Sequence, residues 1–185
     1  SNESFIRQYK WIDNLALRLS YGLQGNIDKG TSPFLVGKYD NVNILPGYSE
    51  ENIIINSAPN SKLRWEKTAS YNLGIDFSVL NQAINLSVDY YYRKGTDLIG
   101  SKALALENGF TNMSINWASM ENKGVEINLQ TRNITTKNFS WYTTFNFAYN
   151  QNKVLKVLTD KSQVTPSLEG YPVGAIFALK TKGIN

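Results

Sequence analysis

The stretch SYNLGIDFSVLNQAINLSVDYYYR, residues 70–93, decides the fold class of this 185-residue chain. Its first half places Tyr71, Leu73, Ile75, Phe77 and Val79 on one side of a strand, with small or polar residues between them. Its second half repeats the same alternation. Only residues 80–83 separate the two halves, and so short a join between two alternating runs predicts a β-hairpin.

Further segments of the chain show the same period of two. We expect strands at about residues 14–25, 66–80, 84–94, 121–132 and 139–151, and a sixth at 173–182. Most of these segments have about ten residues, the length that a tilted strand needs to cross the hydrocarbon of a bilayer, whereas strands of globular proteins average five or six. The sequence therefore predicts an all-β chain of antiparallel up-and-down strands from a transmembrane β-barrel. So few strands cannot close a wide barrel, and we expect the natural molecule to contain more of them.

The connections between the expected strands alternate in length. Residues 26–65, 95–120 and 152–172 form long connections, whereas residues 80–83 and 133–138 form short ones. Outer-membrane barrels have short periplasmic turns and long extracellular loops, so this pattern predicts the direction of each strand. Aromatic residues then gather in two girdles, with Trp11, Phe77 and Trp141 at the periplasmic end and Tyr21, Tyr71, Tyr90, Tyr92 and Tyr149 at the extracellular end.

Composition removes several classes of function. The chain has no His and no Cys, which excludes the usual zinc and copper sites, disulfides, Cys nucleophiles and His general bases. The net charge is +4, but Lys and Arg are scattered without a basic stripe, so nucleic acid is not an expected partner. Asp76 and Asp89 on neighbouring strands invite comparison with a glycosidase pair, yet the sequence suggests neither a raised pKa nor an enclosing pocket. We expect no enzyme activity, no cofactor and no metal.

Four strings of residues resemble one known family. They are PNSKLRWEKTASYNLGIDF at 59–77, NLSVDYYYRKGTDLI at 85–99, SMENKGVEINL at 119–129 and FNFAYNQNKVLKV at 145–157. In this order they resemble the SusC/RagA family of TonB-linked outer-membrane proteins, over roughly residues 15–183. The resemblance implies a barrel of about 22 strands in the outer membrane of a Gram-negative, Bacteroidetes-type bacterium. It also implies import of glycans, oligosaccharides or peptides.

The same resemblance implies several partners. They are outer-membrane lipid, a SusD-like surface lipoprotein over the barrel mouth, and the TonB complex, which would act through a plug domain that lies outside this chain. Charged residues on the expected lumen face are Arg18, Asp76, Asp89, Arg93, Glu126 and Arg132, and each is either a contact for cargo or plug or simply a hydrated lining. In the long connections, Tyr39, Tyr48 and Phe110 are candidates for contact with a ligand or the lid, and equally for local packing anchors.

Two other functions remain compatible with the strand pattern. One is a soluble β-sandwich or adhesin-like module that binds carbohydrate or protein, in which the apolar strand faces would pack against each other. The other is a passive porin-type barrel without a plug. The sandwich and the barrel differ in one observable respect, which is whether protein covers the apolar face.

Overall fold

The computed structural model describes residues 9–55, 57–158, 166–178 and 183. The described elements are β1 (Ile12–Asn26), β2 (Gly37–Leu45), β3 (Tyr48–Ile55), β4 (Glu66–Val79), β5 (Ile84–Ala103), a 3-10 helix η1 (Leu106–Asn108), β6 (Asn112–Thr135) and β7 (Ser140–Lys156). The predicted all-β class is confirmed. In this described part of the chain, no helix has the length and apolar character needed to cross a membrane.

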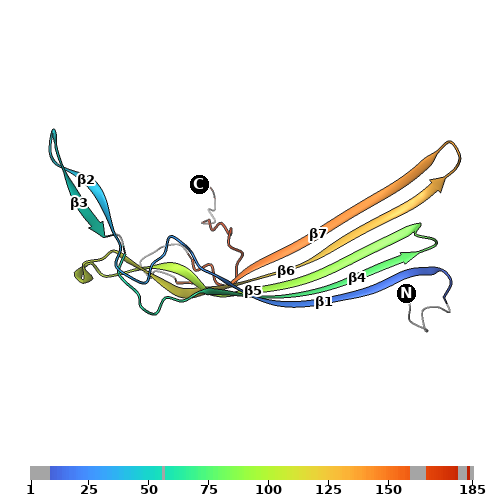
Figure 1. The fold of residues 1–185 in the computed structure, drawn as a ribbon, viewed down its shortest axis with the longest axis horizontal. Coiled ribbons are helices and arrows are strands. Elements are labelled where there is room, and N and C mark those ends of the chain that lie inside the picture. Colours follow the sequence, from blue (N-terminus) through green and yellow to red (C-terminus); the bar gives the residue numbers. More distant parts are fainter. Residues whose placement is uncertain (1–8, 56, 159–165, 179–182, 184–185) are drawn as a thin grey trace. The chain divides into compact units, whose positions relative to one another are not determined.

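Five strands form one sheet in the order β1-β4-β5-β6-β7, and β2 and β3 form a separate two-stranded sheet (Figure 1). Aromatic contacts give the relative direction of β1 and β4. Trp11 meets Phe77 with ring centroids 6.3 Å apart, while Tyr21 lies 4.9 Å from Tyr71. Early residues of one strand therefore meet late residues of the other, as an antiparallel pair requires.

The chain divides into two compact units. The first comprises Ser1–Leu23, Thr68–Lys94 and Glu121–Lys153, and the second comprises Gln24–Lys67, Gly95–Met120 and Val154–Asn185. The first unit carries the alternating segments on which the fold prediction depends, and the second carries most of the long connections.

The apolar face of the first unit is uncovered. Leu17 and Leu19 on β1 are 72% and 81% exposed, and Ile75 on the next strand is also exposed. Among the described residues, the buried apolar side chains are only Val79 and Val154, each 6% exposed. Within this part of the chain no second layer packs on these leucines and isoleucines, which is the observation that separates a lipid-facing sheet from a β-sandwich.

Two expected loops contain regular structure. β5 continues to Ala103 and β6 begins at Asn112, so most of the connection expected at 95–120 is a hairpin extension with η1 at its tip. The extension escapes the sequence pattern because Asp97 adopts a left-handed φ of 57°, which interrupts the alternation after Gly95.

The connection expected at 26–65 contains the β2–β3 hairpin. Its register pairs Gly37 with Ile55 and Tyr39 with Ile53. The hairpin turns at Gly47, whose φ of 87° favours glycine. Its polar central residues hide the strand signal in the sequence.

The sixth strand expected at 173–182 is not formed over residues 173–178. Pro172 accepts a turn hydrogen bond from the Ala175 amide at 3.0 Å, and Gly174 lies within that turn. A turn of this kind cannot belong to a strand, so that part of the prediction is wrong. Residues 179–182 lie outside the described residues, as do residues 159–165 of the expected loop 152–172.

Candidate functional site

The polar face of the first unit holds an ion cluster that links three strands. Arg18 on β1 bonds Asp76 on β4 through Nε, at 3.0 Å from Oδ2, and Asp89 on β5 through Nη2, at 2.9 Å from Oδ1. Ser87 completes the cluster by donating its hydroxyl to Asp76 Oδ1 at 2.8 Å. The alternation of each strand places these residues on one side, and the register of the sheet then brings them together.

A glycine makes room for this cluster. A Cβ atom at Gly74 would lie 2.5 Å from Asp89 Oδ1 and 2.8 Å from Arg18 Nη2. The guanidinium therefore passes directly over backbone that carries no side chain. This close approach explains why a glycine interrupts an otherwise regular strand.

The cluster is half-exposed, which limits its energy. Solvent-exposed ion pairs typically contribute about 0.2–1 kcal/mol each. Within the cluster, a single guanidinium bonds both Asp side chains. Because Arg18 bonds residues of two other strands at once, the arrangement suits alignment of strands better than acid–base chemistry.

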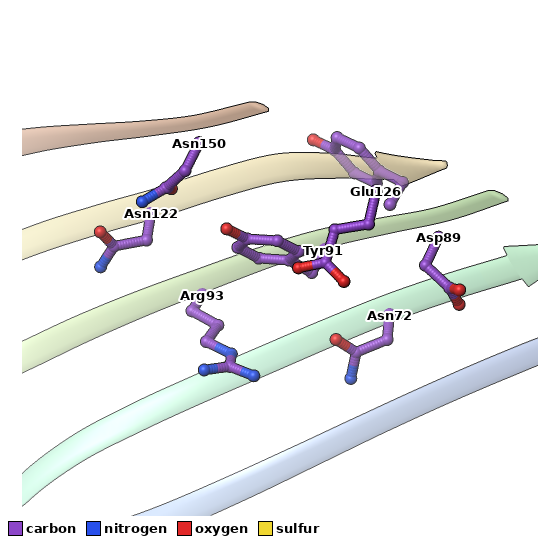
Figure 2. A pocket seen from close by; sticks show the side chains of 8 residues that line it. Asn72, Asp89, Tyr91, Arg93, Asn122, Glu126 and Asn150 are labelled. Carbon is purple, nitrogen blue, oxygen red and sulfur yellow. The ribbon is translucent and has the colours of Figure 1, made fainter. Parts of the chain in front are cut away.

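Next to the cluster, an open hollow of about 510 Å³ lies on the same face (Figure 2). Its side chains come from β4, β5, β6 and β7. They are Asn72, Asp89, Tyr90, Tyr91, Arg93, Asn122, Glu126 and Asn150. Three amides, two carboxylates, a guanidinium and the Tyr91 phenol give this hollow both donors and acceptors, as the binding of hydroxyl-rich or amide-rich molecules requires.

Tyr91 forms part of the floor of the hollow. A Cβ atom at Gly124 would lie 2.6 Å from the Tyr91 ring and 2.5 Å from the carbonyl oxygen of Tyr149, so the phenol lies across that glycine. The Arg93 guanidinium sits 5.6 Å from the centre of the Tyr91 ring, within the range of a cation–π contact. The Tyr91 ring and the Arg93 guanidinium therefore restrict each other's orientation at the edge of the hollow.

The structure brings together most of the predicted polar residues. Arg18, Asp76 and Asp89 form the ion cluster, and Arg93 and Glu126 join Asp89 around the hollow. Arg132 lies apart from them. Its Nη2 donates to the carbonyl oxygen of Asn81 at 2.9 Å, in the turn between β4 and β5.

The tyrosines expected at one end of the strands form a continuous row on the apolar face. Tyr71 lies 4.9 Å from Tyr21 and 6.1 Å from Tyr92, measured between ring centroids. The Tyr92 hydroxyl donates to Glu121 Oε2 at 3.0 Å. Exposed aromatic side chains on the same face are Tyr90, Trp141 and Tyr149.

The candidate contact residues of the long connections belong to the second unit. Tyr39 on β2 is 68% exposed and Tyr48 on β3 is 74% exposed. Phe110 follows η1 and is half-buried. The two tyrosines are thus available to a ligand or a protein, while Phe110 is partly occupied by local packing.

The second unit also contains an ion cluster that the sequence did not suggest. Asp97 accepts from Arg64 Nη2 at 2.6 Å and faces Lys67 Nζ at 3.5 Å. Asn116 donates its amide to the carbonyl oxygens of both Arg64 and Asp97, at 2.6 Å each. The hydrogen bond from Arg64 lowers the pKa of Asp97 below its ordinary value and raises the pKa of Arg64.

Sequence reasoning also missed the uncharged part of the hollow. Asn72, Tyr91, Asn122 and Asn150 sit on its walls, yet the prediction named only charged residues on this face. The available signal was the alternation itself, since each of these residues falls on the polar side of its strand. Every polar residue of that side, and not just the charged ones, is therefore a candidate for the lining of the hollow.

Comparison with known proteins agrees with this architecture. Residues 7–178 match the family model for the β-barrel of TonB-dependent-receptor-like proteins. TonB-dependent receptor P39 of Formosa agariphila is 33% identical over 100% of this chain and 18% of its own length. TonB-dependent receptor SusC of Bacteroides thetaiotaomicron is 31% identical over 84% of this chain and 16% of its own length.

Solved structures give the same result. The RagAB peptide transporter is 27% identical over 83% of this chain and 17% of its own, with a TM-score of 0.69. The RagAB peptide importer in the closed-closed state is 26% identical over 91% of this chain and 19% of its own, with a TM-score of 0.73. The chain spans between 16% and 20% of the length of the curated relatives it matches. The predicted resemblance is confirmed, and the chain belongs to the TonB-dependent-receptor-like β-barrel family.

Proposed function

We propose that this chain is one section of the wall of a TonB-dependent importer in the outer membrane of a Gram-negative, Bacteroidetes-type bacterium. The observation that carries the proposal is the contrast between the two faces of the first unit. Leu17 and Leu19 are exposed on one face, whereas Arg18 between them binds two carboxylates on the other. Lipid on the first side and water on the second is the environment that this contrast requires.

The two edges of the sheet support a larger barrel. Among the described residues, β1 and β7 are the edge strands, and each has backbone groups on one side without a partner strand. Unpaired backbone N–H and C=O groups are very unfavourable in hydrocarbon. Further strands of the same barrel would satisfy them, in agreement with relatives several times the length of this chain.

The proposed cargo is a glycan, an oligosaccharide or a peptide. One solved structure with the same fold is described as a peptide transporter and another as a peptide importer. The amides, phenol and guanidinium around Tyr91 hydrogen-bond equally well to sugar hydroxyls and peptide groups, so the hollow suits either class of molecule. We place it on the lumen side together with the expected lining residues Arg18, Asp76, Asp89, Arg93, Glu126 and Arg132.

The proposed partners follow from the family. A SusD-like lipoprotein would cover the barrel mouth, with the exposed Tyr39 and Tyr48 and the half-buried Phe110 as candidate contacts. The TonB complex would act on a plug domain supplied by the remainder of the receptor. The two aromatic girdles would mark the limits of the hydrocarbon.

Single-cysteine labelling of the complete receptor tests the orientation of the wall. The chain has no cysteine of its own, so Leu19→Cys on the apolar face and Ser20→Cys on the polar face form a matched pair of neighbours. With a fluorophore attached, Leu19→Cys should be quenched by nitroxides on lipid chains, and Ser20→Cys only by a water-soluble quencher. Equal access of the water-soluble quencher to both positions would overturn the proposal.

Uptake by whole cells tests the activity. Cells that carry the receptor should accumulate labelled oligosaccharides or peptides only while TonB is present. Uptake that continues unchanged without TonB would instead favour a passive porin-type barrel.

A further inference from the structure

Three lysines stand on the apolar face of the first unit, one on each of three adjacent strands. They are Lys94 on β5, Lys123 on β6 and Lys153 on β7, and all three side chains are exposed. Cations on a lipid-facing surface are unfavourable within hydrocarbon, so their grouping needs an explanation. Their neighbours on the sheet supply one.

Contacts on the opposite face fix the direction of these side chains. Asn122 and Asn152 are bonded across β6 and β7 at 2.7 Å, and Asn122 lines the polar hollow. Because successive strand residues point to opposite faces, Lys123 and Lys153 point to the apolar side. Arg93 also lines the hollow, so Lys94 points away from it in the same way.

The lysines lie at the boundary of the apolar surface. Glu121 accepts from the Tyr92 hydroxyl at 3.0 Å, which places the tyrosine row beside Lys94 and Lys123. Leucines and isoleucines cover the apolar face on the short-turn side of the tyrosine row. The three lysines lie at the level of the row or on its long-loop side. A lysine at such a level extends its ammonium toward the interface while its methylenes remain in the apolar layer.

The positive charge of this group is largely uncompensated. Within the described residues, none of the three lysines forms an ion pair, and Glu121 is the single carboxylate among them. Lys156, at the long-loop end of β7, does have a partner. Lys156 lies 3.7 Å from the centre of the Trp117 ring.

We infer that Lys94, Lys123 and Lys153 form a binding site for phosphate-bearing headgroups of membrane lipids. The inference rests on the proposed membrane location of the sheet. Lysine ammoniums attract phosphate as point charges, and each can donate up to three charge-assisted hydrogen bonds to phosphate oxygens. The wall would thereby select its surrounding lipids on the long-loop side, rather than simply tolerate any bilayer.

The complete receptor in lipid vesicles provides the test. The probe is the ratio of phosphatidylglycerol to phosphatidylcholine that remains bound to the protein, measured by native mass spectrometry. One lysine near an anionic lipid surface changes binding by about fivefold. The variant Lys94→Gln/Lys123→Gln/Lys153→Gln should therefore reduce the preference for phosphatidylglycerol by at least about tenfold. The charge-matched control Lys29→Gln/Lys38→Gln/Lys62→Gln, in the second unit, should retain it.

The outcomes are separable. Replacement of all three lysines by arginine should keep the preference for phosphatidylglycerol. This result would show that the glutamine variant loses the preference because it loses positive charge, and not because substitution at these positions prevents folding. An unchanged preference in the glutamine variant overturns the lipid site and leaves the importer proposal intact. Failure of the wild type to insert into vesicles that contain both phosphatidylglycerol and phosphatidylcholine overturns the membrane wall, and the lipid site with it.

Discussion

Replacement of Gly124 by alanine tests whether the close packing of the polar face stabilises the wall. A Cβ atom at this position would lie 2.5 Å from the Tyr149 carbonyl oxygen and 2.6 Å from the Tyr91 ring. Real Cβ contacts essentially never fall below 3.0 Å, so neighbouring backbone on β7 has to move by about 0.5 Å. Overpacking of this kind costs about 1–3 kcal/mol in free energy of unfolding.

The matched control is Gly22→Ala. Gly22 also falls on the polar side of its strand, but no atom lies within 4 Å of the place that a Cβ would occupy there. Alanine at this position reduces the entropy of the unfolded chain and should be neutral, or stabilising by at most about 1 kcal/mol. The two variants therefore differ in local crowding and not in chemistry.

Urea unfolding of the complete receptor in vesicles, followed by the electrophoretic shift between folded and unfolded barrel, measures both variants. Adding Tyr91→Ser to Gly124→Ala should recover only part of the loss, because the contact with the Tyr149 carbonyl remains. If Gly124→Ala unfolds at the same urea concentration as Gly22→Ala, the steric argument is wrong.

Three further predictions concern charge and turn geometry. Arg18→Met leaves Asp76 and Asp89 facing each other and should cost about 0.5–2 kcal/mol in low salt, with partial recovery in high salt, as measured by urea unfolding. Because the pKa of Asp97 is lowered in the folded protein, its ion pair stabilises the fold above the ordinary pKa of 3.8, and this stabilisation is lost as the pH falls through the lower folded pKa. Backbone hydrogen exchange around residue 97 should become faster over that pH range. Asp97→Asn should abolish this pH dependence. Gln82 has a left-handed φ of 59°, so Gln82→Gly should be neutral or stabilise the barrel by up to about 1 kcal/mol, as measured by the same urea unfolding; a destabilisation larger than that would contradict the geometry.

The wall of the first unit was predictable because lipid and water impose opposite demands on successive residues. Residues 70–79 and 84–93 each alternate without interruption, and the structure places Asp76 and Asp89 on the face opposite Ile75. The short connection at 80–83 predicted the pairing of β4 with β5. Position in the alternation placed Arg18 on the same face as both carboxyl groups, but the register that brings them into contact was not predicted from the sequence.

The second unit was less predictable, because its strands obey other constraints. β2 and β3 are exposed throughout their described residues, so neither face has to be apolar and no period of two is visible. The ion cluster around Asp97 depends on a backbone irregularity that no spacing rule reveals. In the first unit, Gly124 was likewise invisible as a packing site, since its significance comes from Tyr91 on the next strand.

The turn at 80–83 is held by both neighbouring strands. The Leu80 amide donates to the Trp11 carbonyl at 3.0 Å, and the Arg132 amide donates to the Ala83 carbonyl at 2.7 Å. Four strands, β1, β4, β5 and β6, thus begin or end within a few residues of these two hydrogen bonds. Insertions and deletions in the long connections, at the other ends of these strands, would then leave the pairing of strand residues unchanged. Evolution can therefore lengthen, shorten or replace the long connections for new cargo without changing the register of the sheet.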